Sequence, residues 1–290
     1  MSVQKTVSDL SILFDSRKSW GLLFAIATAT GIFCTSDPLA DISISVLVLT
    51  PLSTFAIIIG MYVFNDIVDL QIDIDNKKFH RPLPSGDVNL HNAVMFVVIM
   101  NIIGITIASI NSTVIPTLVI VAIGVLYSLP GPSLKDRSVL KTLAIASTMM
   151  FALLVGATAT NDLVPYSVFA GLMLFMMVFV TSPINDIADI KGDLIAGRKT
   201  IPILIGSRNT MILSSGVVGL MFVLSWIIDI IWVSIPVSMV LVLTMLNIIQ
   251  LYRNRDCISR SVISRSIPLH LALQLALVIG WLGVTYTTVF

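Results

Sequence analysis

Two short segments of the chain repeat the same arrangement of amide and carboxylate side chains. Residues 65–73 read Asn-Asp-Ile-Val-Asp-Leu-Gln-Ile-Asp, and residues 185–193 read Asn-Asp-Ile-Ala-Asp-Ile-Lys-Gly-Asp. Both fit Asn-Asp-x-x-Asp-x-x-x-Asp, and positions i, i+3 and i+7 share one face of a helix. The spacing therefore predicts three aligned carboxylates in each segment. The acids are Asp66, Asp69, Asp73, Asp186, Asp189 and Asp193, and each segment begins with an amide, Asn65 or Asn185.

Each acidic segment directly follows a long apolar run, where charged side chains are costly unless they bind a partner. Mg²⁺ takes oxygen ligands and bridges carboxylates to substrate phosphates. Two acidic faces opposed across a cavity would hold Mg²⁺ ions that clamp a diphosphate and neutralise it as a leaving group. A single Asp at a helix end is usually a cap, but two copies of one constellation indicate metal ligation by all six. The two Asn would complete the metal shell or orient a carboxylate by hydrogen bonding.

Basic side chains lie in the same polar loops. Phosphate oxygens attract Arg and Lys strongly, so these residues are candidate diphosphate ligands. An excess of Lys and Arg also marks cytoplasmic loops in general, and the sequence leaves both explanations open for each residue. The candidates are Lys77, Arg81, Lys135, Arg137, Arg198 and Lys199.

The composition indicates a membrane protein. The chain of 290 residues is 56% hydrophobic and only 11% charged, whereas soluble domains are about a quarter charged. A membrane span needs about 20 apolar residues, and the charge-free windows predict nine spans, with a break at 111–113 inside the longest window. The windows are 19–36, 42–65, 88–134 (two spans), 142–161, 163–185, 209–228, 230–252 and 266–290.

We therefore expect an all-α polytopic membrane protein, with one nine-helix transmembrane domain at 19–290 and a cytoplasmic N-terminal segment at 1–18. Residues 7–14 form either a short interfacial helix or a disordered tail. All 17 Lys and Arg lie in the N-terminal tail and in the loops after the second, fourth, sixth and eighth predicted spans. By the positive-inside rule, the N-terminus and both Asp motifs are cytoplasmic and the C-terminus lies on the opposite face. The duplicated motif also indicates a parallel internal repeat.

Several other residues allow two interpretations or none. Tyr127, at the cytoplasmic end of the fourth predicted span, is an interfacial anchor or a ring near a cationic reacting carbon. The methionines of the sixth span either pack against neighbouring helices or line a flexible lipid pocket; they include Met173, Met176 and Met177. Three histidines have no nucleophile at a recognisable spacing, so we assign no role to His80, His91 and His270.

The assembled motifs resemble those of the UbiA superfamily of intramembrane prenyltransferases. The segment from Asn65 to Asp73, with Arg81-Pro82-Leu83-Pro84-Ser85-Gly86 behind it, is similar to the family's first Asp-rich signature. The segment 185–193, followed by Gly197, Thr200, Pro202 and Gly206, is similar to the second. Tyr127-Ser128 with Leu134-Lys135 resembles the family's Tyr/Lys element. The chain departs from the family at Ser16-Arg17-Lys18-Ser19-Trp20, where many members have Arg-Pro followed by Asn or Thr.

The resemblance implies a nine-helix bundle around a central cavity that is open sideways to lipid. Such enzymes bind a polyprenyl diphosphate through Mg²⁺, and an acceptor captures the allylic carbocation in an apolar pocket that excludes water. By position, Asn65 and the six Asp match the metal–diphosphate ligands. Lys135 matches the diphosphate-binding Lys, Tyr127 the pocket Tyr, and Arg81 falls in the matching Arg-Pro-x-Pro-Ser-Gly segment.

The resemblance is compatible with more than one prenyl acceptor. The second motif, with Gly192-Asp193, is nearer to the chlorophyll-synthase, homogentisate and archaeal digeranylgeranylglyceryl-phosphate-synthase branches. We expect geranylgeranyl transfer to geranylgeranylglyceryl phosphate, because a phosphorylated acceptor would use the surplus Arg and Lys. The alternatives are prenylation of an aromatic quinone or chlorin precursor, terpene cyclisation, and secondary transport. The expected cofactor is Mg²⁺, and the expected partners are a polyprenyl diphosphate, a lipophilic acceptor and the bilayer, with no nucleic acid.

Overall fold

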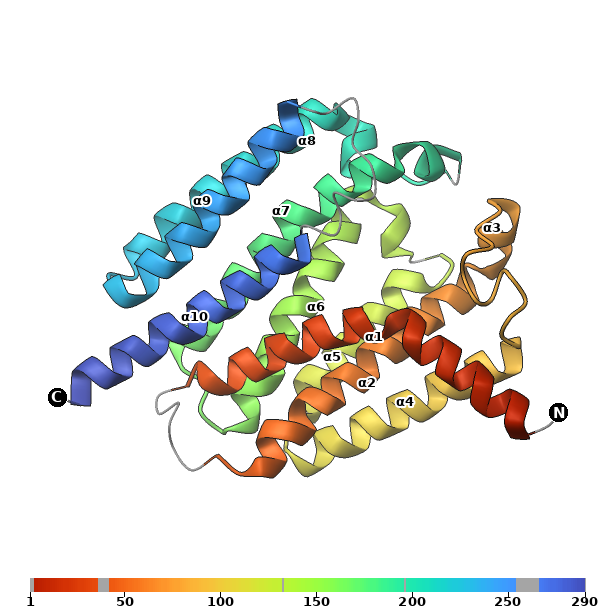
Figure 1. The fold of residues 1–290 in the computed structure, drawn as a ribbon, viewed down its shortest axis with the longest axis horizontal. Helices are drawn as coiled ribbons and strands as arrows, with labels where there is room; N and C mark the ends of the chain where they lie inside the picture. The colour runs from red at the N-terminus through yellow and green to blue at the C-terminus, as the bar shows by residue number, and fades with distance from the viewer. Residues whose placement is uncertain (1–2, 36–41, 132, 196, 254–265, 290) are drawn as a thin grey trace.

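The computed structural model describes residues 3–35, 42–131, 133–195, 197–253 and 266–289, and within them the chain is helical without a β-strand (Figure 1). A single isolated backbone bridge joins Arg137 to Lys199 in the described residues. In chain order the elements are α1 (Val3–Phe33), α2 (Ile44–Val68), α3 (Leu70–Asp75), α4 (Leu90–Ile110), α5 (Val114–Ser128), the 3₁₀ helix η1 (Leu134–Asp136), α6 (Ser138–Ala159), α7 (Pro165–Ile195), α8 (Ile201–Ile227), α9 (Ile231–Arg253) and α10 (Ser266–Val289).

Seven of the described helices are long and apolar enough to cross a membrane: α2, α4, α6, α7, α8, α9 and α10. Helix α5 is apolar but shorter, and the first half of α1 is polar. Each predicted window overlaps one long helix or, for 88–134, two helices. The break predicted at 111–113 separates α4 from α5. The expected all-helical membrane architecture is therefore confirmed, with seven helices that meet the length and hydropathy of a span.

The N-terminal residues extend the first helix. Of the two expectations for residues 7–14, the helix is right, but it is continuous with the rest of α1. Buried Asp9 attaches this segment to the start of α4, because its carboxylate accepts hydrogen bonds from the Asn89 backbone N–H (3.0 Å) and the Asn92 amide (2.7 Å). The Asn89 N–H and the neighbouring Lys5 ammonium lower the pKa of Asp9 to about 2.

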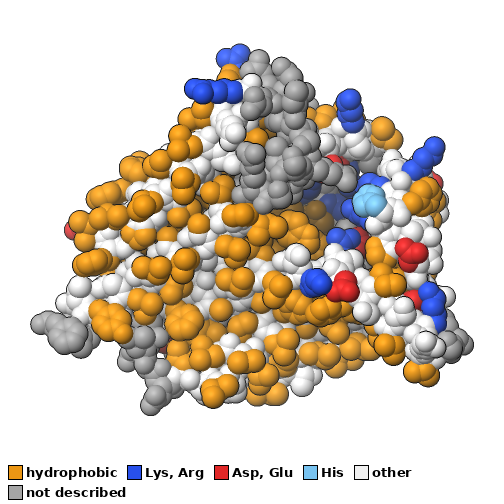
Figure 2. Space-filling model, viewed as in Figure 1, with side chains coloured by type: hydrophobic (Ala, Val, Ile, Leu, Met, Phe, Trp, Pro, Cys, Tyr) orange, Lys and Arg blue, Asp and Glu red, His pale blue; other side chains and the backbone are white. Residues whose placement is uncertain are grey.

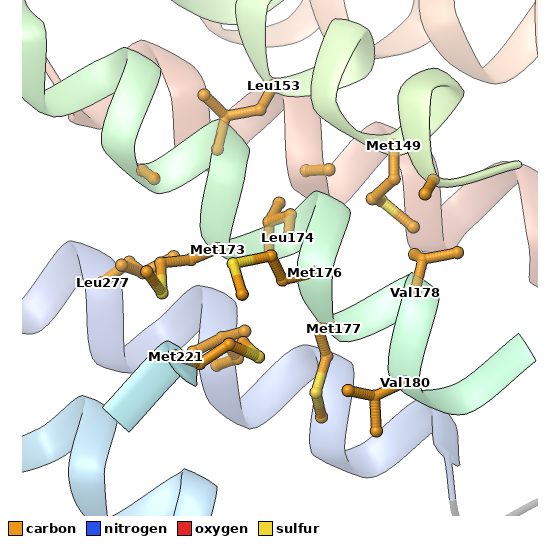
Figure 3. Packing of buried hydrophobic residues seen from close by; sticks show 14 of the residues in the cluster. Met149, Leu153, Met173, Leu174, Met176, Met177, Val178, Val180, Met221 and Leu277 are labelled. Atoms are coloured by element: carbon orange, nitrogen blue, oxygen red, sulfur yellow. The ribbon is translucent and has the colours of Figure 1, made fainter. Parts of the chain in front are cut away.

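Helix α7 is the central element of the bundle. Its apolar window is 67% buried, compared with 22% for the peripheral helix α4. In Figure 1, α8 and α9 lie on one side of α7, and α1, α2 and α4 lie on the other. Figure 3 shows methionines of α7 packed against neighbouring helices, and three of them belong to the buried core: Met173, Met176 and Met177. Helix packing is therefore the correct interpretation of these methionines.

Helices α1 and α6 touch through their backbones. A Cβ atom on Gly31 would lie 1.9 Å from the Leu153 carbonyl oxygen, and one on Gly156 would lie 1.8 Å from the Thr28 carbonyl oxygen. The Thr28 hydroxyl lies 2.8 Å from the Ala152 carbonyl oxygen, so the contact also includes a hydrogen bond between the helices. Only glycine allows this approach, which holds α1 against the middle of the bundle.

We expect Gly156→Ala to destabilise the protein, because the new methyl group meets backbone that cannot rotate away. Overpacking of this kind costs about 1–3 kcal/mol, which should lower the midpoint of thermal unfolding in detergent. The matched control is Gly219→Ala in α8, where a Cβ meets no atom within 4 Å and alanine favours the helix. Equal midpoints for the two variants would contradict the close approach.

Candidate active site

A turn at Asp69 interrupts the helix that carries the first Asp motif. Helix α2 ends at Val68, Asp69 occupies the turn, and α3 begins at Leu70. The helical hydrogen bonds survive across the turn, since the Asp69 N–H bonds to the Asn65 carbonyl (2.9 Å) and the Asp73 N–H bonds to the Asp69 carbonyl (2.8 Å). Asp66 therefore lies on α2, Asp69 in the turn and Asp73 on α3, and the alignment of the three carboxylates stays a prediction.

The second Asp motif lies on a continuous helix. Helix α7 runs through Pro183 to Ile195, so the carboxylates of Asp186, Asp189 and Asp193 share one helix as predicted. Asp186 and Asp193 are buried, and Asp189 is half-buried.

Both motifs face one cavity of about 390 Å³ between α1, α2, α5, α6, α7 and α10. Its polar lining includes Asn65, Asp66, Asp69, Asn185, Asp186 and Asp189. Its apolar lining includes Ile58, Met61, Ile120, Met149 and Val178. Figure 2 shows charged side chains around a hollow near α3, while hydrophobic side chains cover most of the rest of this face. The cavity therefore combines an ionic region with an apolar wall.

Basic side chains neutralise the first motif. Asp66 accepts from the Nε of Arg17 (2.9 Å), and Arg81 lies 3.4 Å from the other oxygen of Asp66. Arg81 also pairs with Asp73 (2.5 Å), which Lys78 approaches to 3.0 Å. Arg81 therefore bridges two carboxylates of the same motif.

Two further cations pair with Asp69, and one of them also reaches the second motif. Lys135, on η1, lies 2.6 Å from Asp69, and the guanidinium of Arg198 lies 3.2 Å from the second oxygen of Asp69. Arg198 also lies 3.6 Å from Asp193 of the second motif. Burial by itself would lower the pKa of Arg198, but the carboxylates of Asp69 and Asp193 outweigh that effect and raise it. Arg198 therefore stays charged and links the two motifs.

The structure brings most of the predicted site residues together. Besides the residues above, the cavity wall includes the ring of Tyr127, which supports its pocket interpretation. Asp73 and Asp193 are buried next to the cavity and pair with Arg81 and Arg198.

Three of the predicted cations lie outside the cavity lining. Lys77 is exposed in the turn after α3, and its neighbour Lys78 makes the ion pair. Arg137 is exposed and donates to the Gly131 carbonyl (3.3 Å), and Lys199 is exposed at the backbone bridge. The general excess of basic residues in cytoplasmic loops is enough to account for these three.

Besides Lys78, which pairs with Asp73, sequence reasoning missed two further cations of the site. Arg17 pairs with Asp66, and Lys141 on α6 lies 2.7 Å from Asp186. Both immediately flank a predicted apolar window, Lys141 directly before 142–161 and Arg17 two residues before 19–36. A charge at that depth in a membrane protein needs a partner, and this signal could have identified them.

The aromatic and histidine lining was also missed. Trp20 and Tyr62 line the cavity with their rings stacked 5.9 Å apart, and the Arg17 guanidinium lies 5.8 Å from the Tyr62 ring centre. His270 on α10 lines the cavity too, although no role was expected for it. None of these residues carries a signal in its local sequence.

The donor set of the site fits Mg²⁺. In the described part of the chain no three acidic, His or Cys side chains are arranged as a metal cage, because the carboxylates face basic side chains. Within the described residues, two buried oxygens of the motif carboxylates nevertheless have neither a hydrogen bond nor an ion pair: Oδ2 of Asp186 and Oδ2 of Asp193. Leaving such an oxygen unpaired costs about 1–3 kcal/mol, and oxygen ligands are the ones that Mg²⁺ prefers. Metal ligation by the six Asp stays a prediction.

The fold and the site define a helical integral membrane protein with a cavity in which ion-paired acidic residues adjoin an apolar wall. Residues 22–266 match the profile of the UbiA prenyltransferase family, and the chain belongs to this family. Its sequence is 29% identical over 175 residues to a digeranylgeranylglyceryl phosphate synthase of Methanobrevibacter smithii, covering 58% of this chain and 61% of the relative. The chain thus spans less than two thirds of the length of this relative and of other similarly named ones.

Solved structures share the fold. One is described as giving structural and mechanistic insights into digeranylgeranylglyceryl phosphate synthase in membranes; it has a TM-score of 0.73 at 22% identity, over 96% of this chain and 99% of that one. Another is a UbiA homologue from Archaeoglobus fulgidus bound to GPP and Mg²⁺, with a TM-score of 0.70 at 17% identity, over 95% and 98% of the two chains.

We expect Lys135→Ala to destabilise the protein, because it removes one of the two cations that neutralise buried Asp69. The free energy of unfolding should fall by about 2 kcal/mol, because Arg198 still pairs with Asp69 in the variant. Thermal unfolding in detergent measures it. Lys77→Ala is the control and should stay within about 0.5 kcal/mol of the parent, as exposed substitutions usually do. A Lys135→Ala midpoint equal to that of the control would refute the buried ion pair.

Proposed function

We propose that this protein is a Mg²⁺-dependent prenyltransferase that moves a geranylgeranyl group from geranylgeranyl diphosphate to geranylgeranylglyceryl phosphate. The observation that carries the proposal is the single cavity in which two Asp motifs and their cations adjoin an apolar wall. Such a cavity suits a ligand with an anionic head and a hydrocarbon tail. Membership of the UbiA prenyltransferase family and the names of the relatives support the reaction type and the acceptor.

The charge balance of the site supports binding of a diphosphate together with metal ions. Six basic side chains form ion pairs with carboxylates of the two motifs, and the formal charges of these six bases balance those of the six motif acids. The basic residues are Arg17, Lys78, Arg81, Lys135, Lys141 and Arg198. A diphosphate alone would leave this neutral site strongly negative. Mg²⁺ held by the Asp carboxylates would supply the missing positive charge and polarise the leaving group.

The protein's own groups would then act on the two ends of the donor. Lys135, Lys141 and Arg198 would donate hydrogen bonds to phosphate oxygens and stabilise the charge that builds up as the bond from carbon to diphosphate oxygen breaks. The apolar wall would exclude water from the allylic cation. The rings of Trp20, Tyr62 and Tyr127 would face its positive charge. The electron pair of the broken bond leaves with the diphosphate, and the acceptor oxygen forms the new ether bond.

We also infer the orientation and the full set of spans. Helix α5 and the second half of α1 would join the seven apolar helices as spans, which gives nine in one domain at 19–290. Both Asp motifs then lie on the face that carries the basic loops, with the N-terminus, and the C-terminus lies on the opposite face. The expected clustering of the motif carboxylates at one face favours an enzyme over a secondary transporter, whose charged sites lie near the membrane midplane.

The test of the function is a product assay. Membranes containing the protein are incubated with labelled geranylgeranyl diphosphate and Mg²⁺, with and without geranylgeranylglyceryl phosphate, and the lipids are analysed by mass. We expect a diether phosphate that requires both substrates. A cyclised hydrocarbon or alcohol formed without acceptor would contradict the proposal and indicate terpene cyclisation. A product formed only when an aromatic acceptor is supplied would show that the acceptor is aromatic and not geranylgeranylglyceryl phosphate.

The same assay tests the motifs. Asp69→Asn and Asp189→Asn should each lower product formation about 100-fold, because each removes a carboxylate that holds the metal ions. The control is Asp229→Asn, an exposed residue between α8 and α9 with a left-handed backbone that Asn tolerates. Turnover retained in both motif variants would refute the mechanism.

Titration calorimetry with inorganic diphosphate tests whether metal ions are needed to balance the charge of the bound anion. Because the site is neutral without metal, diphosphate should bind at least about tenfold more tightly in Mg²⁺ than in EDTA. Equal affinity in the two solutions would show that the basic residues bind the anion without metal.

A further inference from the structure

The N-terminal half of α1 lies against the loop between α3 and α4, which comprises residues 76–89 and carries Arg81. In Figure 1 this half of α1 meets the start of α4 at the end of the molecule where α3 also lies. The buried carboxylate of Asp9 accepts hydrogen bonds from the Asn89 backbone N–H (3.0 Å) and from the Asn92 amide (2.7 Å). Asp9 therefore attaches α1 to the last residue of this loop.

Two further contacts extend the attachment along the loop. The Lys5 ammonium donates a hydrogen bond to the Asp87 carbonyl oxygen (2.9 Å). The side chain of Leu13 is buried in one apolar cluster with Leu83 and Val88 of the loop. Both hydrogen bonds and apolar packing thus hold the loop against α1.

The backbone of the loop connects this attachment to Arg81, because internal hydrogen bonds close it into a turn. The Val88 N–H donates to the Pro82 carbonyl (3.2 Å), and the Ser85 N–H donates to the Arg81 carbonyl (3.1 Å). Holding the end of the loop against α1 therefore also holds the backbone at Arg81 and Pro82.

Arg81 in turn joins the two helices that share the first Asp motif. Its guanidinium lies 2.5 Å from the Asp73 carboxylate on α3 and 3.4 Å from the Asp66 carboxylate on α2. The turn at Asp69 separates these helices, and α3 has only six residues. A helix this short is marginal by itself, so the Arg81 bridge helps to define where Asp73 lies relative to Asp66.

We propose that Asp9 is a positioning residue of the active site, which acts through the loop 76–89 to hold Arg81 between Asp66 and Asp73. Asp9 does not line the cavity, so its effect on a ligand passes through these residues. Replacing such an outer partner commonly changes metal affinity or activity about 10–100-fold. The inference rests on the proposed function, because it assumes that the first motif binds a diphosphate together with Mg²⁺.

The first experiment measures binding of inorganic diphosphate in Mg²⁺ by titration calorimetry, with the full chain in detergent. Asp9→Ala removes the acceptor of the Asn89 N–H and should weaken binding about tenfold. Asp9→Asn keeps an oxygen that accepts this hydrogen bond, so binding should stay within about threefold of the parent. The matched control is Asp15→Ala, which changes an exposed residue of α1 that pairs with Lys18 and should leave the affinity unchanged.

A double-mutant cycle shows whether Asp9 acts through Arg81. Arg81→Met alone should weaken diphosphate binding, because it removes the bridge between the two carboxylates. Adding Asp9→Ala to Arg81→Met should then change the affinity by less than about twofold, since residues that act through one another are not additive. If Asp9→Ala weakens binding by the same factor with and without Arg81, its role is merely structural and the inference is wrong.

Amide hydrogen exchange tests the attachment directly and without a ligand. Asp9→Ala should speed exchange within residues 81–89, because the loop opens more often, and should leave residues 185–193 of the second motif unchanged. If Asp9→Ala does not fold, Lys5→Met is the second variant. Lys5 is exposed, and loss of its hydrogen bond to Asp87 should still speed exchange in the same segment.

Contrary results separate the inference from the proposed function. Unchanged exchange at residues 81–89 in Asp9→Ala, or a diphosphate affinity equal to that of the parent, would overturn the role of Asp9. Failure of the unsubstituted protein to bind diphosphate in Mg²⁺ would refute the proposed function instead.

Discussion

The arrangement of this protein depends on the neutralisation of six carboxylates at the ends of two apolar helices. An ionised carboxylate in a low-dielectric setting is unstable unless a cation approaches it. The required cations come from outside the motifs: Arg17 from α1, Arg81 from the loop after α3, Lys135 from η1, Lys141 from α6 and Arg198 from the loop before α8. The ion pairs therefore tie most elements around the cavity to the two motif helices.

The same constraint separates the two chemical environments of the cavity. The motif charges occupy one region of the lining, and aliphatic and aromatic side chains of α1, α2, α5, α6 and α7 form much of the rest. A packed core holds these helices in place, with methionines of α7 at its centre (Figure 3). Glycines allow the close crossing of α1 and α6. A cavity of this kind can hold an anionic group and a hydrocarbon chain at once.

Much of the architecture could be read from the sequence because its signals are local. Long charge-free windows predict membrane helices, since burial in lipid demands them, and Asn111 to Thr113 predict a break through their turn preference. The motif spacing predicts aligned carboxylates, which α7 confirms. The bend at Asp69 was not predictable in this way, because the turn keeps helical hydrogen bonds and leaves no mark in the residue pattern.

The sequence by itself determined the membrane-helical class, the two acidic segments and the surplus of nearby cations, because each follows from residue type and spacing along one helix or loop. Only the tertiary structure decided which cations reach which carboxylates. Arg17 and Lys141 reach the site while Lys77 and Arg137 do not, and His270 comes to face Thr181 across 89 residues of sequence. The physical reason is that these contacts join different helices, whose mutual rotation and depth are set by core packing over the whole bundle.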